Sequence, residues 1–539
     1  MLGLLSALLL ITAALLARVV HLVLNYVLLR KSNRMRLPPG PWPWPVVGNL
    51  LQLHQGGKNL HKTFAGLAQQ YGPIVYLSLG SVQTVVVSSP MMAKEFLKTH
   101  DQEFQYRPKL TLAAEILMGN NGMAVSTGGP SWRHLRRICS TELFSAKRLQ
   151  SFQSMRTKEI NSTINDIYME SEEGKVVDLK FQLSSLIINI LTQMMFRKRY
   201  FGVDESKQDE MYCFKEVTEK VSSWLGGLII SDYIPSLRWL VRLQGTEASL
   251  HALCKKKSQF IQKLIVEHQK LSIEVDQVRD LGNENVANTP KDFMDVLLST
   301  PQEDGTGNLS KETIETFVLE LLMGGTETSP VTIEWAMAEL IRNPMIMKRA
   351  QMELETVVGM NRTVEESDLH KLTYLQAVIK ETFRLHPPGP LLFPHSSMKK
   401  VCGIAESYDI PPHARVIVNI WAMGRDPSTW ERPLEFYPER FLQQQQQQHP
   451  TAVEIIDMHE KNFNLLPFGS GRRACPGRPL ATIVVQIILA RLLHSFHWVL
   501  PNQQEPNTLD MSEVFGTVLP RAQPLHLKAY PKLLAHLYK

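Results

Sequence analysis

The longest apolar block of the chain is its first 29 residues, in which Arg18 is the only charged side chain. A helix rises about 1.5 Å per residue, so one of this length can cross a hydrocarbon core of about 30 Å. Four basic residues follow at positions 30–36, and positive residues beside a membrane span stay cytoplasmic. A cleaved signal peptide is the alternative, but neither a basic start nor a small-residue cleavage site is evident. We expect residues 1–29 to form a transmembrane helix that leaves the rest of the chain in the cytosol.

Prolines dominate the next segment. Residues 37–45 read Leu-Pro-Pro-Gly-Pro-Trp-Pro-Trp-Pro, with five prolines in nine residues. Because proline fixes φ and has no N–H, this stretch favours a stiff, extended backbone and excludes a continuous helix. We expect residues 30–46 to be a basic, proline-rich hinge that joins the membrane anchor to a catalytic domain over residues 47–539. A ligand for a proline-binding module is the alternative.

Beyond the hinge, the pattern predicts a small β region and a larger helical one. Two alternating apolar runs, 74–79 and 82–87, flank Gly80-Ser81 and predict a β-hairpin. The remaining pattern is mostly helical, with long apolar-rich segments at 313–341, 371–385 and 480–496. The expected fold class is therefore mainly α with a smaller β region.

Composition narrows the class of protein. With 539 residues and 44% hydrophobic residues, the chain can form one large helical domain organised by a cofactor. Lys and Arg number 58 against 52 for Asp and Glu, and the two signs are interspersed, so a nucleic-acid-binding function is not indicated. Polar residues 282–290 predict a loop, and the six glutamines 443–448 predict a flexible insertion. No CxxC pair, and hence no zinc site or disulfide framework, is formed by Cys139, Cys213, Cys254, Cys402 and Cys475.

One cysteine stands in an unusual loop. Residues 467–477 read Pro-Phe-Gly-Ser-Gly-Arg-Arg-Ala-Cys-Pro-Gly and lead into the apolar segment 480–496. Cys475 precedes the expected helix, whose N–H groups and dipole favour a thiolate that can ligate iron. The glycines let the backbone approach a flat ligand, and Arg473 can pair with an anionic group on that ligand. Taken alone, Cys475 would more often be a buried cysteine in a turn.

A second unusual stretch lies within the apolar segment 313–341. Residues 324–330 read Gly-Gly-Thr-Glu-Thr-Ser-Pro. Each glycine inside a helix costs about 1 kcal/mol relative to alanine, and Pro330 disrupts a backbone hydrogen bond. A flat ligand against the small side of the helix, beside an acid and a hydroxyl, would offset that cost. A kinked core helix is the alternative.

Two residue pairs have helical spacing. Glu381 and Arg384 are three residues apart and share one helix face, where such a pair is usually a surface ion pair. Trp132 and Arg136 are four residues apart, and by themselves they would be a packing tryptophan and a surface arginine.

The full spacing Phe-Gly-x-Gly-x-Arg-x-Cys-x-Gly resembles the haem-binding loop of the cytochrome P450 monooxygenases. The start Pro-Pro-Gly-Pro is similar to the plant microsomal (A-type) branch of these haem-thiolate enzymes. The resemblance implies the cytochrome P450 fold, preceded by the N-terminal transmembrane helix. It covers the whole chain in one order: anchor, proline hinge, Trp132 pair, Glu327-Thr328, Glu381-x-x-Arg384, Pro438 to Phe441, and the cysteine loop.

The resemblance implies a set of cofactor-binding residues. Cys475 is the axial ligand of the haem iron, in the loop that Phe468 begins and Gly477 ends. The haem propionates are contacted by side chains from separate parts of the chain, namely Trp132, Arg136, His395 and Arg473.

Catalytic and structural roles follow from the same resemblance. Glu327 relays protons, and Thr328 holds oxygen and its water, because cleavage of the O–O bond needs protons. Glu381, Arg384 and Arg440 form a buried ion cluster that supports the cysteine loop.

The implied enzyme inserts one atom of O2 into a lipophilic plant metabolite, either a fatty acid or a phenolic or flavonoid. Its cofactor is haem b, and its electrons come from NADPH through NADPH-cytochrome P450 reductase. It is expected in the endoplasmic reticulum membrane as a single-pass protein. The alternatives are a non-catalytic haem-binding protein and an O2-independent isomerase or dehydratase, although the latter enzymes tend to lose the acid-hydroxyl pair. The residues expected to line the substrate pocket are mostly apolar: Leu112, Ile116, Leu117, Phe317, Leu391, Leu392, Phe393 and Phe515.

Overall fold

The computed structural model describes residues 35–55, 59–119, 122–202, 205–226, 229–280, 291–302, 307–446 and 463–538. The expected transmembrane helix over residues 1–29 and the polar stretch 282–290 lie outside the described residues. The glutamine run is described as far as residue 446. Its first four residues continue helix α21 (Glu439–Gln446), because glutamine is a good helix former.

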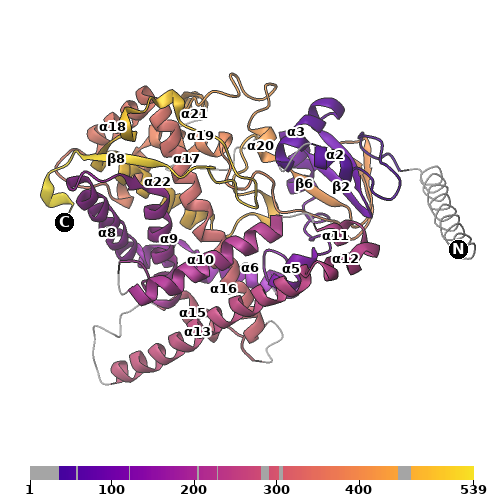
Figure 1. Cartoon of the computed structure of the whole chain (residues 1–539), viewed down its shortest axis with the longest axis horizontal. Helices are drawn as coiled ribbons and strands as arrows, with labels where there is room; N and C mark the ends of the chain where they lie inside the picture. The colour runs from indigo at the N-terminus through magenta and orange to yellow at the C-terminus, as the bar shows by residue number, and fades with distance from the viewer. Residues whose placement is uncertain are drawn as a thin grey trace, which may run out of the picture.

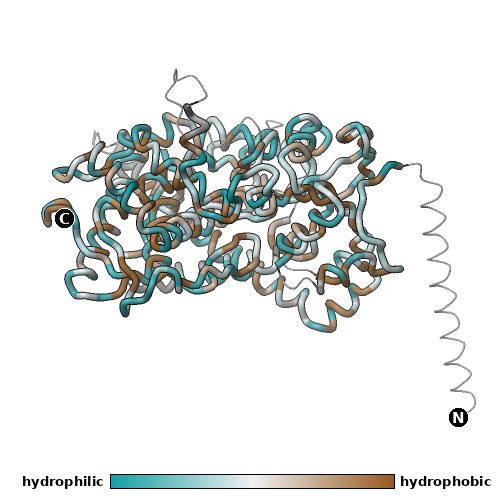
Figure 2. The backbone as a smooth tube through the Cα atoms, turned by 90° about the horizontal axis from the view of Figure 1, so that it is seen from above, coloured by the Kyte–Doolittle hydropathy of each residue, from teal (hydrophilic) through white to brown (hydrophobic). Residues whose placement is uncertain are grey.

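Helices make up most of the molecule (Figure 1), as the apolar pattern predicts. Colouring by hydropathy shows hydrophilic and hydrophobic residues alternating over short distances along the helices, the pattern of amphipathic helices around a core (Figure 2). The ten longer helices are α3 (Leu60–Tyr71), α8 (Gln153–Glu172), α9 (Leu179–Phe196), α10 (Glu205–Gly226), α13 (Thr246–Asp280), α16 (Lys311–Thr326), α17 (Thr328–Arg342), α18 (Pro344–Val357), α19 (Thr373–Leu385) and α22 (Arg478–Ser495). The shorter ones are α2 (Leu50–Gln55), α4 (Pro90–Lys94), α5 (Leu112–Met118), α6 (Pro130–Ile138), α7 (Ala146–Ser151), α11 (Ile230–Tyr233), α12 (Arg238–Leu243), α15 (Phe293–Ser299) and α20 (Ile420–Met423).

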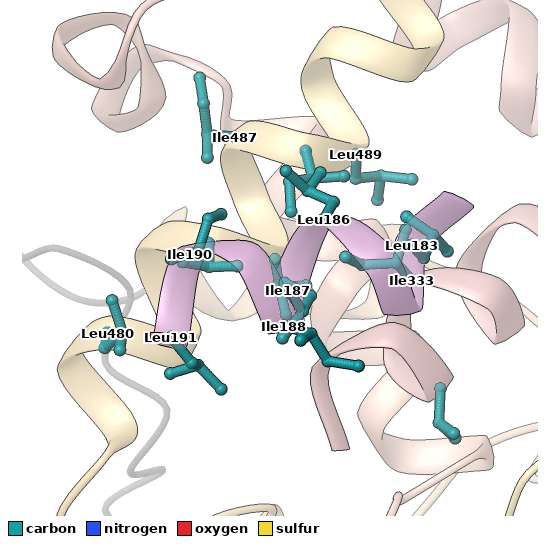
Figure 3. Close-up of a cluster of buried hydrophobic side chains, with 14 of the residues drawn as sticks. Leu183, Leu186, Ile187, Ile188, Ile190, Leu191, Ile333, Leu480, Ile487 and Leu489 are labelled. Carbon is teal, nitrogen blue, oxygen red and sulfur yellow. The ribbon is translucent and has the colours of Figure 1, made fainter. Parts of the chain in front are cut away.

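Helices α9, α17 and α22 form the centre of the core. They are apolar on almost every face, and most of their residues are buried. Figure 3 shows Leu186 of α9 close to Leu489 of α22, and Leu183 of α9 close to Ile333 of α17. Within the described part of the chain, α22 is long and apolar enough to cross a membrane, but 78% of it is buried in the protein, as in a core helix.

The predicted hairpin is confirmed with the expected bounds. β1 (Ile74–Leu79) pairs antiparallel with β2 (Val82–Val87), and β6 (Arg415–Val418) joins parallel to β2, with Thr84 opposite Arg415. Gly80 turns the hairpin at φ 58°, and a Cβ there would lie 2.3 Å from the Tyr233 carbonyl oxygen. The turn therefore packs directly on α11. The other sheets combine β3 (Val177–Asp178), β8 (His526–Pro531) and β7 (Phe496–Val499), and β4 (Val401–Ile404) with β5 (Tyr408–Ile410).

The apolar segment 313–341 forms two helices rather than one. α16 ends at Thr326 and α17 begins at Thr328, so Glu327 lies at the break. Pro330 has no N–H to donate to the Thr326 carbonyl four residues earlier, and its ring crowds that carbonyl. Before the break Gly324 is exposed, and residues 325–328 are half-buried.

Candidate active site

The cysteine loop is a tight turn that ends in the first residues of α22. Gly469 and Gly471 have φ of 64° and 71°, and a Cβ at Gly471 would lie 2.2 Å from the Leu97 carbonyl oxygen. The N–H of Cys475 donates to the carbonyl oxygen of Phe468 at 2.9 Å, which closes the loop. The Phe468 ring meets the Phe383 ring of α19 at 5.5 Å, so the loop is fixed to a buried helix.

Cys475 is exposed, yet burial raises the pKa of its thiol. The sulfur is thus accessible to a ligand, while the protein atoms around it penalise the charged thiolate. The N–H of Gly477, Arg136 and the N–H of Arg478 each lower the pKa of this thiol, but desolvation outweighs them. The N–H groups at the start of the helix thus favour the thiolate, as expected, but in the free thiol their effect is smaller than that of desolvation. Coordination to a metal would deprotonate the thiol outright.

Cationic side chains converge beside the cysteine loop. Arg136 of α6 donates to the Ala474 carbonyl at 2.5 Å, within the cysteine loop. Arg473 lies 4.1 Å from the centre of the buried Trp132 ring, and it donates to carbonyl oxygens of the 105–126 segment. Burial, followed by repulsion from Arg107 and Arg136, lowers the pKa of Arg473 to about 9. Clustered cations of this kind fit an anionic ligand, because buried charges need partners.

His395 lies in the same region as a neutral side chain. Its Nδ1 is 2.9 Å from the Phe104 carbonyl oxygen. Burial, then repulsion from Arg107, lowers the pKa of His395 to about 3. Trp132, Arg136, His395 and Arg473 are thus in one part of the molecule, although they lie far apart in the sequence.

Arg107 and Glu320 belong to this site and were missed in the sequence. Arg107 donates to the carbonyls of Ala124 at 2.8 Å and Pro394 at 2.9 Å, and burial lowers its pKa to about 10. Glu320 of α16 accepts from the N–H groups of Met123 at 2.6 Å and Ala124 at 3.0 Å. Burial raises the pKa of Glu320 to about 7. No local spacing links these residues, because their partners are up to 287 positions away.

Open space lies beside Gly324, close to the break between α16 and α17, and is called the groove below. A Cβ at Gly324 would meet nothing within 4 Å, whereas one at Gly325 would lie 2.5 Å from Leu191. Gly324 thus leaves open space for a ligand, and Gly325 serves the packing of α16 on α9. The Thr328 hydroxyl donates to the Gly324 carbonyl at 2.8 Å, which fixes the hydroxyl at the groove.

Glu327 is held by α10. The Ser222 hydroxyl donates to Glu327 Oε2 at 3.0 Å, and the Ser222 carbonyl accepts from the Thr517 hydroxyl at 3.0 Å. Ser222 is a further site residue that the sequence did not indicate, since no motif surrounds it.

Glu381, Arg384 and Arg440 form a buried ion cluster. Glu381 accepts from Arg384 Nε and Nη2, both at 2.7 Å, and from Arg440 Nε at 3.3 Å. It also accepts from the Tyr437 N–H at 2.7 Å. Both guanidinium groups extend to backbone carbonyls between residues 424 and 435, so α19 is tied to the chain that leads into α21.

The comparison with known protein families decides the identity of this arrangement. The cytochrome P450 family model matches residues 38–527, nearly the whole chain. The chain belongs to the cytochrome P450 family. It is a cytochrome P450 monooxygenase related to curated plant enzymes.

Plant P450s of similar length match along almost their whole sequence. Cytochrome P450 750A1 of Pinus taeda is 40% identical, over 97% of this chain and 96% of its own. Cytochrome P450 703A2 of Arabidopsis thaliana is 38% identical, over 96% of this chain and 98% of its own. Flavonoid 3'-monooxygenase CYP75B137 of Crocosmia x crocosmiiflora is 37% identical, over 94% of this chain and 95% of its own.

A solved zebrafish cytochrome P450 with progesterone has the same fold. It superposes with a TM-score of 0.70 at 24% identity, over 87% of this chain and 99% of its own. The expected P450 fold, mainly helical with a small β region, is therefore confirmed.

Two cavities lie in the described part of this P450, and only the larger is lined by residues at the break between α16 and α17. The larger, about 980 Å³, lies between α10, the groove and the 514–522 segment, and Glu327, Leu322 and Thr517 line it. The smaller, about 210 Å³, is lined by Leu391, Leu392 and Phe393 among others, and Phe515 lines both. Four residues expected in the pocket line neither cavity. They pack in or against the hydrophobic core instead: Leu112, Ile116, Leu117 and Phe317.

Proposed function

We propose that this P450 binds haem b through Cys475 and hydroxylates a lipophilic plant metabolite at the end of the larger cavity. The observation that carries the proposal is the accessible but desolvated Cys475 thiol, with clustered arginines beside it. When bound, haem supplies the chemistry that activates O2 and inserts one oxygen atom into a C–H bond.

The residues around Cys475 fit the porphyrin. Arg136 and Arg473, with the buried Trp132 and neutral His395, would hold its carboxylate groups, and Arg107 adds a further cation. Phe468 and Gly477 would shape the loop around the sulfur, since a Cβ at Gly477 would lie 3.9 Å from Cys475 Sγ.

The groove would supply protons and exclude bulk water. Glu327 lines the larger cavity and holds a hydrogen bond to Ser222, so its carboxylate can pass a proton from that cavity toward the groove. Thr328 would hold a proton at its hydroxyl beside the open space at Gly324. Glu381, Arg384 and Arg440 would act only through structure, by holding the chain that supports the cysteine loop.

A fatty acid and a phenolic or flavonoid are both proposed as substrate classes. Most of the larger cavity is lined by apolar residues such as Leu53, Ile188 and Phe515, which suits either class. A relative named as a flavonoid 3'-monooxygenase supports the flavonoid class, at 37% identity. Retention of Glu327 and Thr328 argues against an O2-independent isomerase or dehydratase.

Membrane and partner assignments belong to the same proposal. Residues 1–29 would anchor the protein in the endoplasmic reticulum membrane with its catalytic domain in the cytosol. Electrons would come from NADPH through cytochrome P450 reductase, and exposed arginines near the cysteine loop such as Arg472 would meet an acidic surface of that partner.

The test is spectroscopic first and chemical second. Microsomes that contain the full chain should show, after reduction and treatment with carbon monoxide, the absorbance typical of thiolate-ligated haem. With reductase and NADPH, they should convert a fatty acid or a flavonoid to a product heavier by one oxygen atom, detected by mass spectrometry. Folded protein without that absorbance, or with an imidazole-ligated haem, would overturn the proposal.

A further inference from the structure

The charged side chains that line the smaller cavity are all positive. Three cationic side chains line it, Arg107, Lys109 and Arg415, and no carboxylate does. In the larger cavity, by contrast, Lys180 and Arg521 share the wall with three glutamates. A cavity with cations and no acid is electrostatically suited to an anion.

Of the two arginines that line this cavity, Arg415 has fewer hydrogen-bond acceptors than Arg107. It lies on β6, and Ile417, two residues on and therefore on the same face of the strand, also lines the cavity. Its side chain is only 9% exposed. Nη1 donates to the Tyr233 hydroxyl oxygen at 3.0 Å, while Nε is buried without an acceptor. Among the described residues, no carboxylate lies within 4.0 Å of this guanidinium.

The neighbouring charges leave room for an anion. Burial raises the pKa of Asp232, and the charges of Arg415 and Lys109 oppose this rise, so Asp232 is a neighbour of Arg415. Its Oδ1 accepts from the Leu112 N–H at 2.8 Å and its Oδ2 is buried without a hydrogen-bond partner, but Asp232 does not line the cavity. Arg107 is already engaged by carbonyl oxygens of Ala124, Phe393 and Pro394. Because a buried guanidinium normally has an ionic partner, Arg415 is prepared for an anion that comes from outside the chain.

Tyr233 is fixed by hydrogen bonds so that its hydroxyl lies beside Arg415. Its carbonyl accepts from the N–H and hydroxyl of Ser81, at the hairpin turn where Gly80 packs. Its hydroxyl oxygen accepts from Arg415, which leaves the O–H hydrogen for another acceptor. Arg415 and Tyr233 together therefore offer two donors to one carboxylate.

The size of this cavity indicates which part of a ligand it would take. At about 210 Å³ it has roughly a fifth of the volume of the larger cavity, which measures about 980 Å³. A ligand that occupies both would therefore place a small end in this cavity and its longer apolar part in the larger one. Residues 515–517 line both cavities, so a chain that starts at Arg415 can continue past them into the larger cavity, where Glu327 lies.

We propose that Arg415 and Tyr233 bind the carboxylate of an amphipathic substrate, whose apolar chain extends into the larger cavity. This inference rests on the proposed function and narrows it, because a fatty acid carries a carboxylate and a neutral flavonoid does not. Arg415 then determines specificity and is remote from the oxidative chemistry.

The test compares ligands that differ only in charge. The full-length enzyme is titrated with dodecanoate, with its methyl ester and with a neutral flavanone, and binding is followed by the haem absorbance change and by calorimetry. Arg415→Gln should raise the Kd for dodecanoate about 10- to 100-fold, the range for a hydrogen bond to a charged group. Its Kd for the methyl ester should change less than about twofold by the same reasoning. Tyr233→Phe should weaken dodecanoate binding less than Arg415→Gln does, and Arg415→Lys should restore part of the affinity.

Lys348→Gln is the control for loss of a positive charge, because Lys348 is exposed and lines neither cavity. This variant should bind dodecanoate like the wild type.

An equal loss of affinity for dodecanoate and its methyl ester in Arg415→Gln, or no loss for either ligand, would overturn the carboxylate site. Wild type that oxidises the flavanone and does not bind dodecanoate would overturn this inference and leave the proposed function intact. Wild type that lacks thiolate-ligated haem would overturn both, and the carbon monoxide spectrum of each variant identifies any that fail to fold. A phenolic acid that binds in place of dodecanoate, with the same loss in Arg415→Gln, would support the site and assign it to that source of carboxylate.

Discussion

Replacing Glu381 with alanine should destabilise the protein more than other single changes in polar residues. Glu381 is fully buried and accepts four hydrogen bonds, three from guanidinium groups and one from the Tyr437 N–H. Arg384 and Arg440, which are 1% and 8% exposed, would be left without their carboxylate.

The magnitude follows from this geometry. Removing one partner from a buried ion pair typically costs about 3–5 kcal/mol, because the remaining charge stays buried without compensation. The bonds of Arg384 and Arg440 to backbone carbonyls between 424 and 435 would persist, so the two cations cannot simply turn to solvent. We therefore expect the loss to lie within this range. Since a typical domain is stable by about 5–15 kcal/mol, such a loss is a large fraction of the total.

The assay is urea unfolding, followed by tryptophan fluorescence and by the thiolate-haem absorbance. The midpoint should fall while the slope against urea stays the same, which identifies a change in stability. Glu216→Ala is the matched control, because Glu216 forms an exposed ion pair with Lys220 one turn away on α10. Exposed pairs of this kind contribute little, so no measurable shift is expected. A loss below about 1 kcal/mol for Glu381→Ala would refute the argument, since it would mean that the two arginines are compensated without Glu381.

Three further changes test the site itself. Cys475→Ala should abolish the thiolate-haem absorbance while the helical circular dichroism signal remains, and retention of that absorbance would contradict the assigned ligand. Thr328→Ala should keep the haem but lower product formation by about 100-fold and release peroxide instead. The measurement is the ratio of product formed to NADPH consumed. A ratio equal to that of the wild type would contradict the role of the hydroxyl. Because burial raises the pKa of Glu320 from 4.5 to about 7, the folded state binds this proton more tightly than the unfolded state. The free energy of unfolding should therefore fall as pH rises from 4.5 to about 7, and Glu320→Gln should show a smaller fall in urea titrations across that range; an identical pH profile would contradict the shift.

Local patterns in the sequence were enough for several parts of this structure. The hairpin has its predicted bounds because the alternation in both runs places their apolar side chains on one face. A shift of one residue in the pairing would turn those side chains to the other face. The spacing of Glu381 and Arg384 put both on one face of α19, where they pair. The loop before α22 was also evident, since its glycines adopt conformations that other residues rarely take.

Contacts between distant segments could not be read in the same way. Nothing near Arg107 in the sequence indicates that it meets the Ala124 and Pro394 carbonyls. Phe317 and Leu117 were expected in the substrate pocket, but they pack in the core, because the orientation of α16 and α5 decides which apolar face meets a cavity. The two adjacent glycines 324 and 325 differ in role only because Leu191 of α9 lies against one of them.

The sequence by itself determined the family, the glycine-rich cysteine loop and the elements that carry the motifs, because each depends on residues close together in the chain. Only the tertiary structure decided which charges are left unbalanced. Desolvation of the Cys475 thiol outweighs the helix N–H groups, and Arg415 is buried with its Nε lacking an acceptor. Both outcomes depend on how many protein atoms surround the ionisable group, and the tertiary packing decides that number.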